Sequence, residues 1–196
     1  MGSTKEEIMT VALHLFAKNG YEAVSVSQIA GVLGMTKGAL YRHYENKRDI
    51  FLHIVKRMEQ QDSEQARQNE VPEESIEKMP EEYQKVSVED FVGYSKSMFE
   101  YWTEDDFASS FRKMLTIEQF RSEEMQKLYQ QYLVAGPASY VKALFESIGI
   151  VNAKDKAARF YAVMHFYYSL YDGAADKEKV KVEFVSAIKS LVQDLA

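Results

Sequence analysis

Residues 25–44 read SVSQIAGVLGMTKGALYRHY, and this stretch decides the fold of the N-terminal part of the chain. Ser25 is followed three residues later by Gln28, which is the arrangement of a capping box at the start of a helix. Thr36 suits the N-cap of a second helix, residues 36–44. Because a glycine, Gly34, stands between the two segments, the pattern predicts a helix-turn-helix.

A further helix is predicted before this pair, beginning at Ser3 or Thr4 and stopping at Gly20. Its apolar positions recur at helical spacing: Ile8, Val11, Ala12, Leu15 and Phe16. Leu40 and Tyr44, four residues apart, are expected to point back onto the first two helices. The sequence therefore predicts a three-helix N-terminal domain, residues 1–46.

The opposite face of the second helix is small and polar, as a helix that enters a DNA major groove requires. Gly38 and Ala39 have no bulk, so the backbone can approach base edges closely, and the Ala39 methyl suits contact with a thymine methyl. Lys37 can donate to guanine at the helix N-terminus. Tyr41, His43 and Lys47 suit phosphate contacts, and whether Arg42 reads a base or a phosphate is open.

The sequence resembles the TetR family of bacterial repressors over its first quarter. The residues that carry this resemblance are Leu15-Phe16, Gly20-Tyr21, Val24-Ser25-Val26, Ile29-Ala30, Gly34-Met35-Thr36, Gly38, Leu40-Tyr41, His43-Tyr44 and Asn46-Lys47. The resemblance implies that Thr36, Tyr41, His43 and Lys47 contact phosphates and that Lys37 and Gly38 read bases. The full set predicted to bind DNA is Ser25, Ser27, Thr36, Lys37, Gly38, Ala39, Tyr41, Arg42, His43 and Lys47.

The resemblance also implies the organisation of the whole chain. It predicts an all-α protein in which the N-terminal helix-turn-helix domain is joined to a C-terminal helical bundle, residues 47–196, for ligand binding and dimerisation. Such a protein is a ligand-responsive transcriptional regulator, most often a repressor. It binds a palindromic double-stranded DNA operator as a homodimer and is released by a small-molecule effector.

The charge distribution agrees with this division, although the chain as a whole is acidic, with 24 Lys and Arg against 30 Asp and Glu. Residues 1–57 carry eight basic and five acidic side chains, which leaves 16 basic and 25 acidic ones for the remainder. The positive charge is thus confined to the segment expected to meet phosphates. There is no cysteine, no signal sequence and no apolar run long enough to span a membrane, so we expect a cytoplasmic protein without a membrane partner.

Helices are predicted throughout the remainder. The expected starts are Asn46, with Asp49 at the third position, Ser87, Thr103 with Asp106, Ser122, Asn152 or Asp155, and Asp176. The helix from Ser122 is expected to be interrupted at Gly136-Pro137. The acidic stretch 62–86 is expected to extend the preceding helix, then to form a loop, and to be the most mobile segment of the chain.

The last two predicted helices have apolar stripes that suit either a subunit interface or the core of one protomer. Their aromatic content favours the interface, because a helix-turn-helix gains affinity when two copies engage two half-sites. The residues assigned to dimerisation are Tyr161, His165, Tyr168, Phe184, Ile188 and Leu191.

The middle helices are rich in aromatic residues and methionine, which suits an apolar ligand pocket or an ordinary core. The residues assigned to effector binding are Tyr94, Met98, Trp102, Phe111, Met114, Glu118 and Tyr132. The expected effector is apolar or aromatic. Glu118 continues an apolar stripe, so its carboxylate either contacts the ligand or marks the point where that stripe reaches solvent.

The alternatives are a helical ligand-binding or scaffolding protein without DNA binding, and a helical-bundle enzyme. A di-iron bundle needs Glu-x-x-His pairs, and the sequence contains none. Nucleophile-elbow, phosphate-loop and dinucleotide motifs are also missing. We therefore assign no catalytic residue, no metal site and no cofactor, and we favour the regulator.

Overall fold

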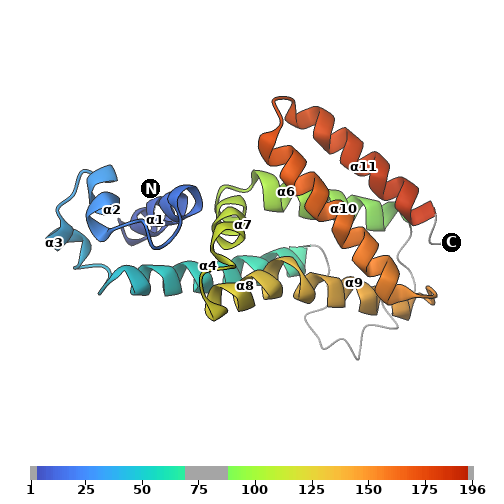
Figure 1. Ribbon diagram of the computed structural model, residues 1–196, viewed down its shortest axis with the longest axis horizontal. Helices are drawn as coiled ribbons and strands as arrows, with labels where there is room; N and C mark the ends of the chain where they lie inside the picture. Colours follow the sequence, from blue (N-terminus) through green and yellow to red (C-terminus); the bar gives the residue numbers. More distant parts are fainter. Residues whose placement is uncertain (1–3, 69–87, 194–196) are drawn as a thin grey trace. The chain divides into compact units, whose positions relative to one another are not determined.

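The computed structural model describes residues 4–68 and 88–193, and every regular element in these ranges is a helix (Figure 1). The helices are α1 (Thr4–Asn19), α2 (Val26–Val32), α3 (Lys37–Leu40), α4 (Lys47–Gln68), α6 (Val88–Glu104), α7 (Asp106–Glu118), α8 (Glu123–Leu133), α9 (Ala135–Ser147), α10 (Ala153–Gly173) and α11 (Lys177–Gln193). The all-α prediction is confirmed. None of the helices described is both long and apolar enough to cross a membrane.

The described residues form two compact units. One unit comprises those within 1–65 together with Asp106–Tyr129, and the other those within 66–105 and 130–196. The first unit includes more than the three N-terminal helices because α7 packs extensively against α1. The domain boundary predicted at residue 46 does not coincide with this division and stays a prediction.

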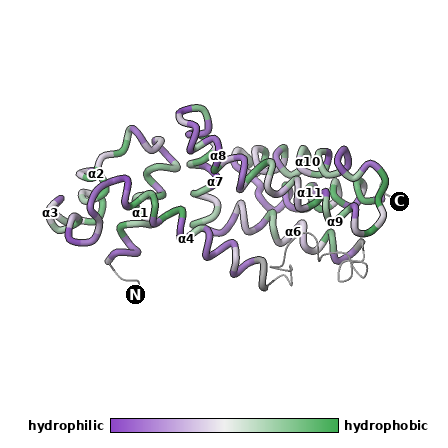
Figure 2. Tube along the Cα trace, turned by 90° about the horizontal axis from the view of Figure 1, so that it is seen from below, coloured by the Kyte–Doolittle hydropathy of each residue, from purple (hydrophilic) through white to green (hydrophobic). Residues whose placement is uncertain are grey.

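The N-terminal core of the first unit follows from the amphipathic pattern of α1. Its buried side chains include Ile8, Ala12, Leu13 and Phe16, and Figure 2 shows apolar and hydrophilic residues alternating along the helices. Burial of these side chains against α2 and α7 is the main stabilising contribution, because apolar surface leaves water. α1 ends before Gly20, whose φ of +83° is the left-handed conformation that glycine adopts without strain.

Several helix boundaries differ from the prediction for local reasons. α3 is regular only to Leu40, because Arg42 and His43 donate their N–H groups to carbonyls three residues earlier and tighten the chain into a turn. Thr103 does not cap α7: its buried hydroxyl donates to the Phe99 carbonyl at 2.7 Å inside α6. The stretch predicted to extend α4 is helical to Gln68, and residues 69–87 lie outside the described residues.

The helix after Ser122 is interrupted as predicted, but the break lies at Val134 between α8 and α9, and the predicted position, Gly136-Pro137, is helical. Pro137 lies in the first turn of α9, where its missing N–H costs nothing. Gly136 is required there, since a Cβ would lie 2.1 Å from the Gln131 carbonyl oxygen. Asp176 caps α11 as predicted, because its carboxylate accepts the Lys179 N–H at 3.0 Å.

The second unit is built from α6, α9, α10 and α11 around an aromatic core. Phe99 lies within it and stacks on Phe184, with 4.2 Å between the ring centroids, and on Tyr168, at 5.6 Å. Phe91 contacts Phe145 and Phe160 with tilted rings, at centroid distances of 5.5 and 5.2 Å. Large aromatic side chains of α10 and α11 therefore complete the interior of a single protomer.

Candidate nucleic-acid interface

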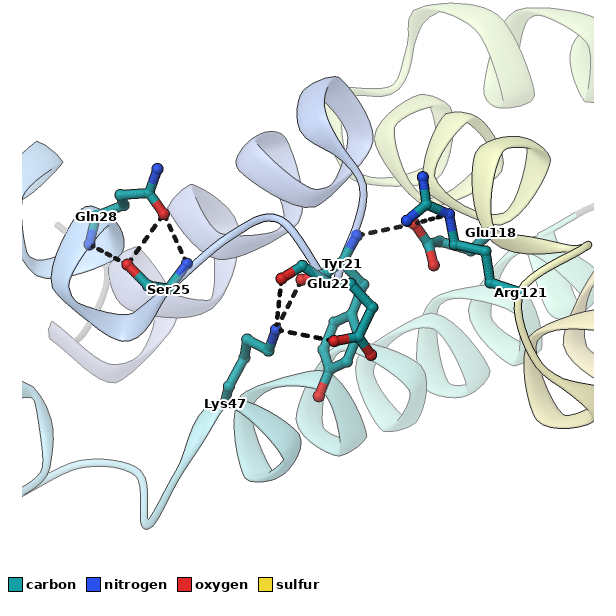
Figure 3. A network of polar contacts seen from close by, with 7 residues as sticks. All are labelled: Tyr21, Glu22, Ser25, Gln28, Lys47, Glu118 and Arg121. Atoms are coloured by element: carbon teal, nitrogen blue, oxygen red, sulfur yellow. Dashed lines mark hydrogen bonds and ion pairs between the residues drawn. The ribbon is translucent and has the colours of Figure 1, made fainter.

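α2 and α3 owe their positions to caps that the sequence predicts. Ser25 Oγ accepts the N–H of Gln28 at 3.2 Å, and the Gln28 side-chain oxygen accepts the N–H of Ser25 at 2.7 Å, so the capping box is complete (Figure 3). Thr36 Oγ1 accepts the Ala39 N–H at 3.1 Å. Ser25 and Thr36 are exposed, but their side-chain oxygens already accept hydrogen bonds within the protein.

The turn between α2 and α3 sets the angle of α3. Gly34 has φ +64°, and the N–H of Met35 reaches back to the Ala30 carbonyl at 3.0 Å. A hydrogen bond that spans five residues closes the end of α2, and glycine is the residue that permits this geometry. The chain then leaves α2 in the conformation typical of a helix-turn-helix.

The inner side of α3 is anchored in the core of the unit. Leu40 is fully buried, and the Tyr44 hydroxyl donates to the Lys5 carbonyl at 2.9 Å. Burial raises the pKa of Tyr44 to about 12. The Tyr44 ring contacts His53 of α4 edge-on, with 5.1 Å between the ring centroids. These contacts hold α3 against α1 and α4 and leave its other side to solvent.

The outer side of α3 carries most of the residues predicted to bind DNA. Lys37 and Gly38 are exposed on α3, where Ala39 is half-exposed, and Tyr41, Arg42 and His43 are exposed in the turn that follows α3. Ser27 is exposed on α2. Lys37 Nζ lies 5.6 Å from the centroid of the Tyr41 ring. Among residues 4–68 and 88–193, neither the Lys37 ammonium nor the Arg42 guanidinium forms an ion pair, so this face is electropositive.

Neither the packing nor the backbone conformation of the protein requires glycine at position 38. A Cβ at this position would meet only Thr36 Oγ1, at 4.0 Å, and Gly38 does not have a positive φ. Glycine destabilises a helix by about 1 kcal/mol relative to alanine, so the fold by itself favours a larger residue. Gly38 is exposed to solvent.

Lys47 is placed differently from the other predicted phosphate contacts. Its side chain is mostly buried, and its ammonium donates to the backbone carbonyl of Tyr21 at 2.8 Å and to that of Glu22 at 3.4 Å (Figure 3). The same nitrogen lies 4.2 Å from the centroid of the Tyr21 ring. Its partners in this structure are all within the protein.

Tyr21 is a central residue to which the sequence analysis gave no role. Its ring packs against Phe16 and Phe51, with centroid distances of 5.0 and 5.3 Å, and burial raises the pKa of its hydroxyl. Its backbone N–H donates to Glu118 Oε1 at 3.0 Å. Tyr21 was part of the family resemblance, and that was the only signal for it in the sequence.

Glu118 does not behave as a side chain held ready for a ligand. It is 1% exposed, and its carboxylate accepts the Tyr21 N–H and lies 3.5 Å from Arg121 Nε. The stripe of α7 that it continues faces α1 of the same unit. Glu118 thus has a partner 97 residues away in the sequence, and its contact with a ligand stays a prediction.

The other residues assigned to effector binding are divided between the two units. Phe111 and Met114 lie with Glu118 in the first unit and are fully buried. The second unit contains Tyr94, Met98, Trp102 and Tyr132, of which Trp102 and Tyr132 are buried and the other two half-buried. None of them lines the groove between α6 and α11, which is formed by Lys96, Glu100, Glu178, Lys181, Val182, Val185, Ser186 and Lys189.

The residues assigned to dimerisation are also of two kinds. Tyr168, Phe184 and Ile188 are buried in the protomer, at 5% exposure or less, and so offer little surface to a partner. Tyr161, His165 and Leu191 are half-exposed. The His165 ring is already bonded through Nε2 to the Leu133 carbonyl at 2.6 Å.

Comparison with known proteins agrees with this geometry. A family model described as "Bacterial regulatory proteins, tetR family" matches residues 8–54. The chain is 41% identical over 51 residues to the HTH-type transcriptional regulator AcrR of Shigella flexneri, covering 26% of this chain and 24% of that protein. It is 29% identical over 133 residues to the HTH-type transcriptional regulator QacR of Staphylococcus aureus, covering 67% of this chain and 65% of the relative. In both cases less than two thirds of the relative is covered.

The fold of the whole chain also has a close parallel. A transcriptional regulator of the "TerR/AcrR family" from Aquifex aeolicus VF5 superposes with a TM-score of 0.69 at 17% identity, covering 96% of this chain and 99% of that one. At this identity the likeness concerns the fold. The residues matched by the family model, 8–54, include α2 and α3.

Proposed function

Because the chain belongs, through its N-terminal helices, to the TetR family of bacterial regulatory proteins, we propose that it is a ligand-responsive transcriptional repressor. It binds a palindromic DNA operator as a homodimer, and a small apolar or aromatic effector releases it. The relatives are transcriptional regulators, which favours this proposal over an enzyme or a helical scaffold.

The observation that carries the proposal is the face of α3 around Gly38. This face combines unpaired cations with a glycine that the protein's own packing does not require. A duplex supplies what fits such a surface, since base edges can approach the bare backbone and phosphates can pair with Lys37 and Arg42. Because the chain as a whole is acidic, its net negative charge disfavours contact between DNA phosphates and the other surfaces of the protein.

Dimerisation is supported by apolar side chains that α10 and α11 leave uncovered. Phe166 is 60% exposed and Leu170 37% exposed on α10, and Val182 is 70% exposed on α11. Exposed apolar residues suit an isologous interface between two copies. The proposed interface uses this surface, and the buried Tyr168, Phe184 and Ile188 support it from within.

The effector is proposed to bind in the second unit, beside Tyr94, Met98, Trp102 and Tyr132. Aromatic and methionine side chains favour flat or elongated apolar molecules. Trp102 is the only tryptophan of the chain and therefore reports binding by its fluorescence. An effector that releases DNA but leaves the emission of Trp102 unchanged would place the site elsewhere.

The proposal is tested by replacing Gly38 with leucine and measuring affinity for duplexes recovered by the protein from a random-sequence pool. A Cβ at Gly38 meets only Thr36 Oγ1, at 4.0 Å, and the position is exposed, so the Gly38→Leu variant is expected to fold. It should lose at least tenfold in affinity, because the side chain fills the space that base edges occupy. Gly93→Leu is the matched control, since Gly93 is an exposed helical glycine of α6 with nothing within 4 Å of a Cβ. If both variants bind DNA like the unaltered protein, α3 does not meet DNA.

A further inference from the structure

The ammonium group of Lys37, the first residue of α3, lies over the ring of Tyr41, the residue that directly follows α3. The nitrogen is 5.6 Å from the ring centroid, which is within the range of a cation–π contact. The backbone N–H of Tyr41 donates to the Lys37 carbonyl at 3.1 Å, so one helical turn separates the two residues. Side chains four positions apart lie on the same side of a helix, and this turn therefore brings the ring beneath the charge.

The residues between Lys37 and Tyr41 offer the lysine little support. Gly38 has no side chain, and Ala39 presents only a methyl group. Leu40 is fully buried on the inner side of α3. Within the described ranges, 4–68 and 88–193, Lys37 forms no ion pair that would draw its ammonium elsewhere. The ring of Tyr41 is thus the contact that orients this side chain.

The ring limits the conformations of a long side chain without using up its hydrogen-bond donors. A lysine side chain has several rotatable bonds, and fixing them on binding costs conformational entropy. A lysine that already rests on a ring loses less of this entropy when it meets a base. Because the ring lies on one side of the ammonium, N–H donors on its other side stay available for O6 and N7 of guanine.

We propose that Tyr41 is a positioning residue for base recognition, whose ring holds the Lys37 ammonium in place to read a guanine. This inference rests on the proposed DNA-binding function and deepens it. Tyr41 is 43% exposed, so its hydroxyl can contact a phosphate while its ring supports the lysine. A hydroxyl bound to a phosphate would fix the ring on the DNA backbone. One residue would then connect the register on the duplex with the reading of a base.

Variants of Tyr41 separate the ring from the hydroxyl. The probes are the duplex that the unaltered protein selects from a random pool and the single base-pair substitutions of that duplex. Lys37→Ala identifies the base pair that Lys37 reads, because substitution of that pair ceases to weaken binding. At this pair, Tyr41→Leu should lower discrimination about three- to fivefold, whereas Tyr41→Phe, which keeps the ring, should stay within about 1.5-fold of the unaltered protein.

His43→Leu is the matched control, because His43 is an exposed aromatic residue in the same turn. It is six positions from Lys37, whereas neighbours on a helix surface are three or four positions apart. The control should bind all duplexes more weakly by the same factor and keep its discrimination at the Lys37 base pair. The double variant Lys37→Ala/Tyr41→Leu should discriminate as Lys37→Ala does, since the ring acts through the lysine.

A second measurement needs no DNA. Protons held over the face of an aromatic ring resonate upfield of their usual position. The ε protons of Lys37 should therefore be shifted upfield in the NMR spectrum of the unaltered full-length protein and of Tyr41→Phe. They should return to the ordinary lysine position in Tyr41→Leu.

All variants are compared at a temperature at which circular dichroism shows each to be folded. The proposal is overturned if Tyr41→Leu discriminates like the unaltered protein, or if Tyr41→Phe loses as much as Tyr41→Leu, since the hydroxyl would then be responsible. It is also overturned if Lys37→Ala relaxes no base pair and lowers the slope of log affinity against log salt by about 0.9 per subunit, which would make Lys37 a phosphate contact. If the unaltered protein selects no duplex, the proposed function itself fails, and this is known before any variant is made.

Discussion

Gly20 and Glu118 are fitted to each other across 98 positions of the sequence: Glu118 Oε1 occupies a point only 2.7 Å from where a Cβ of Gly20 would be. Gly20 also has φ +83°, which disfavours any other residue. Two separate penalties are therefore expected for a side chain at this position, one from the backbone and one from the carboxylate.

Gly20→Ala is predicted to lower the free energy of unfolding by about 1–3 kcal/mol from the backbone strain alone, and further because the new methyl displaces Glu118. Urea unfolding of the single and double variants separates the two contributions. In a Glu118→Ala background the cost of Gly20→Ala should be smaller, because only the strain remains. Equal costs in the two backgrounds would show that the carboxylate moves aside freely.

Core and surface positions of α10 and α11 are predicted to respond differently. Ile188→Ala, at a fully buried position, should lower the free energy of unfolding by about 2–5 kcal/mol. Phe166→Glu places a charge on an exposed side chain and should leave the fold intact while converting the dimer to a monomer. Light scattering combined with thermal unfolding distinguishes the outcomes, and a folded Phe166→Glu dimer would place the interface elsewhere.

Glu104 is predicted to make the second unit sensitive to acid. The Lys181 ammonium, 2.9 Å away, holds the pKa of the Glu104 carboxyl below its usual value, and the Tyr171 hydroxyl also donates to it. A lowered pKa in the folded state contributes stability above the ordinary value of glutamate, and this stability is lost as the pH falls through the folded-state pKa.

Glu104→Gln should therefore be less stable than the unaltered protein at pH 7, by less than about 1 kcal/mol because the carboxylate is partly exposed. The difference should close as the pH is lowered below the range in which glutamate titrates. Denaturant unfolding of both proteins at several pH values measures it. A difference that is independent of pH would mean that the pair with Lys181 does not contribute.

Local features of this protein could be predicted from its sequence, and distant contacts could not. The capping box of Ser25 and Gln28 and the Asp176 cap are fixed by residues three positions apart, so their spacing was sufficient. Lys47 and Glu118 have partners 26 and 97 residues away, which local spacing does not reveal. The stripe containing Phe184 and Ile188 shows only that one side of α11 is buried, because a core and an interface require the same apolar spacing.

The central claim is sequence-specific binding of DNA by a two-fold symmetric protein, and selection from random duplexes with the full-length protein tests it most directly. The account predicts enrichment of an inverted repeat whose two halves lie on one face of the duplex, separated by about one helical turn or a multiple of it. Enrichment should fail when Gly38→Leu is used and persist with Gly93→Leu. A pool that shows no enriched inverted repeat after repeated rounds with the unaltered protein would contradict the account.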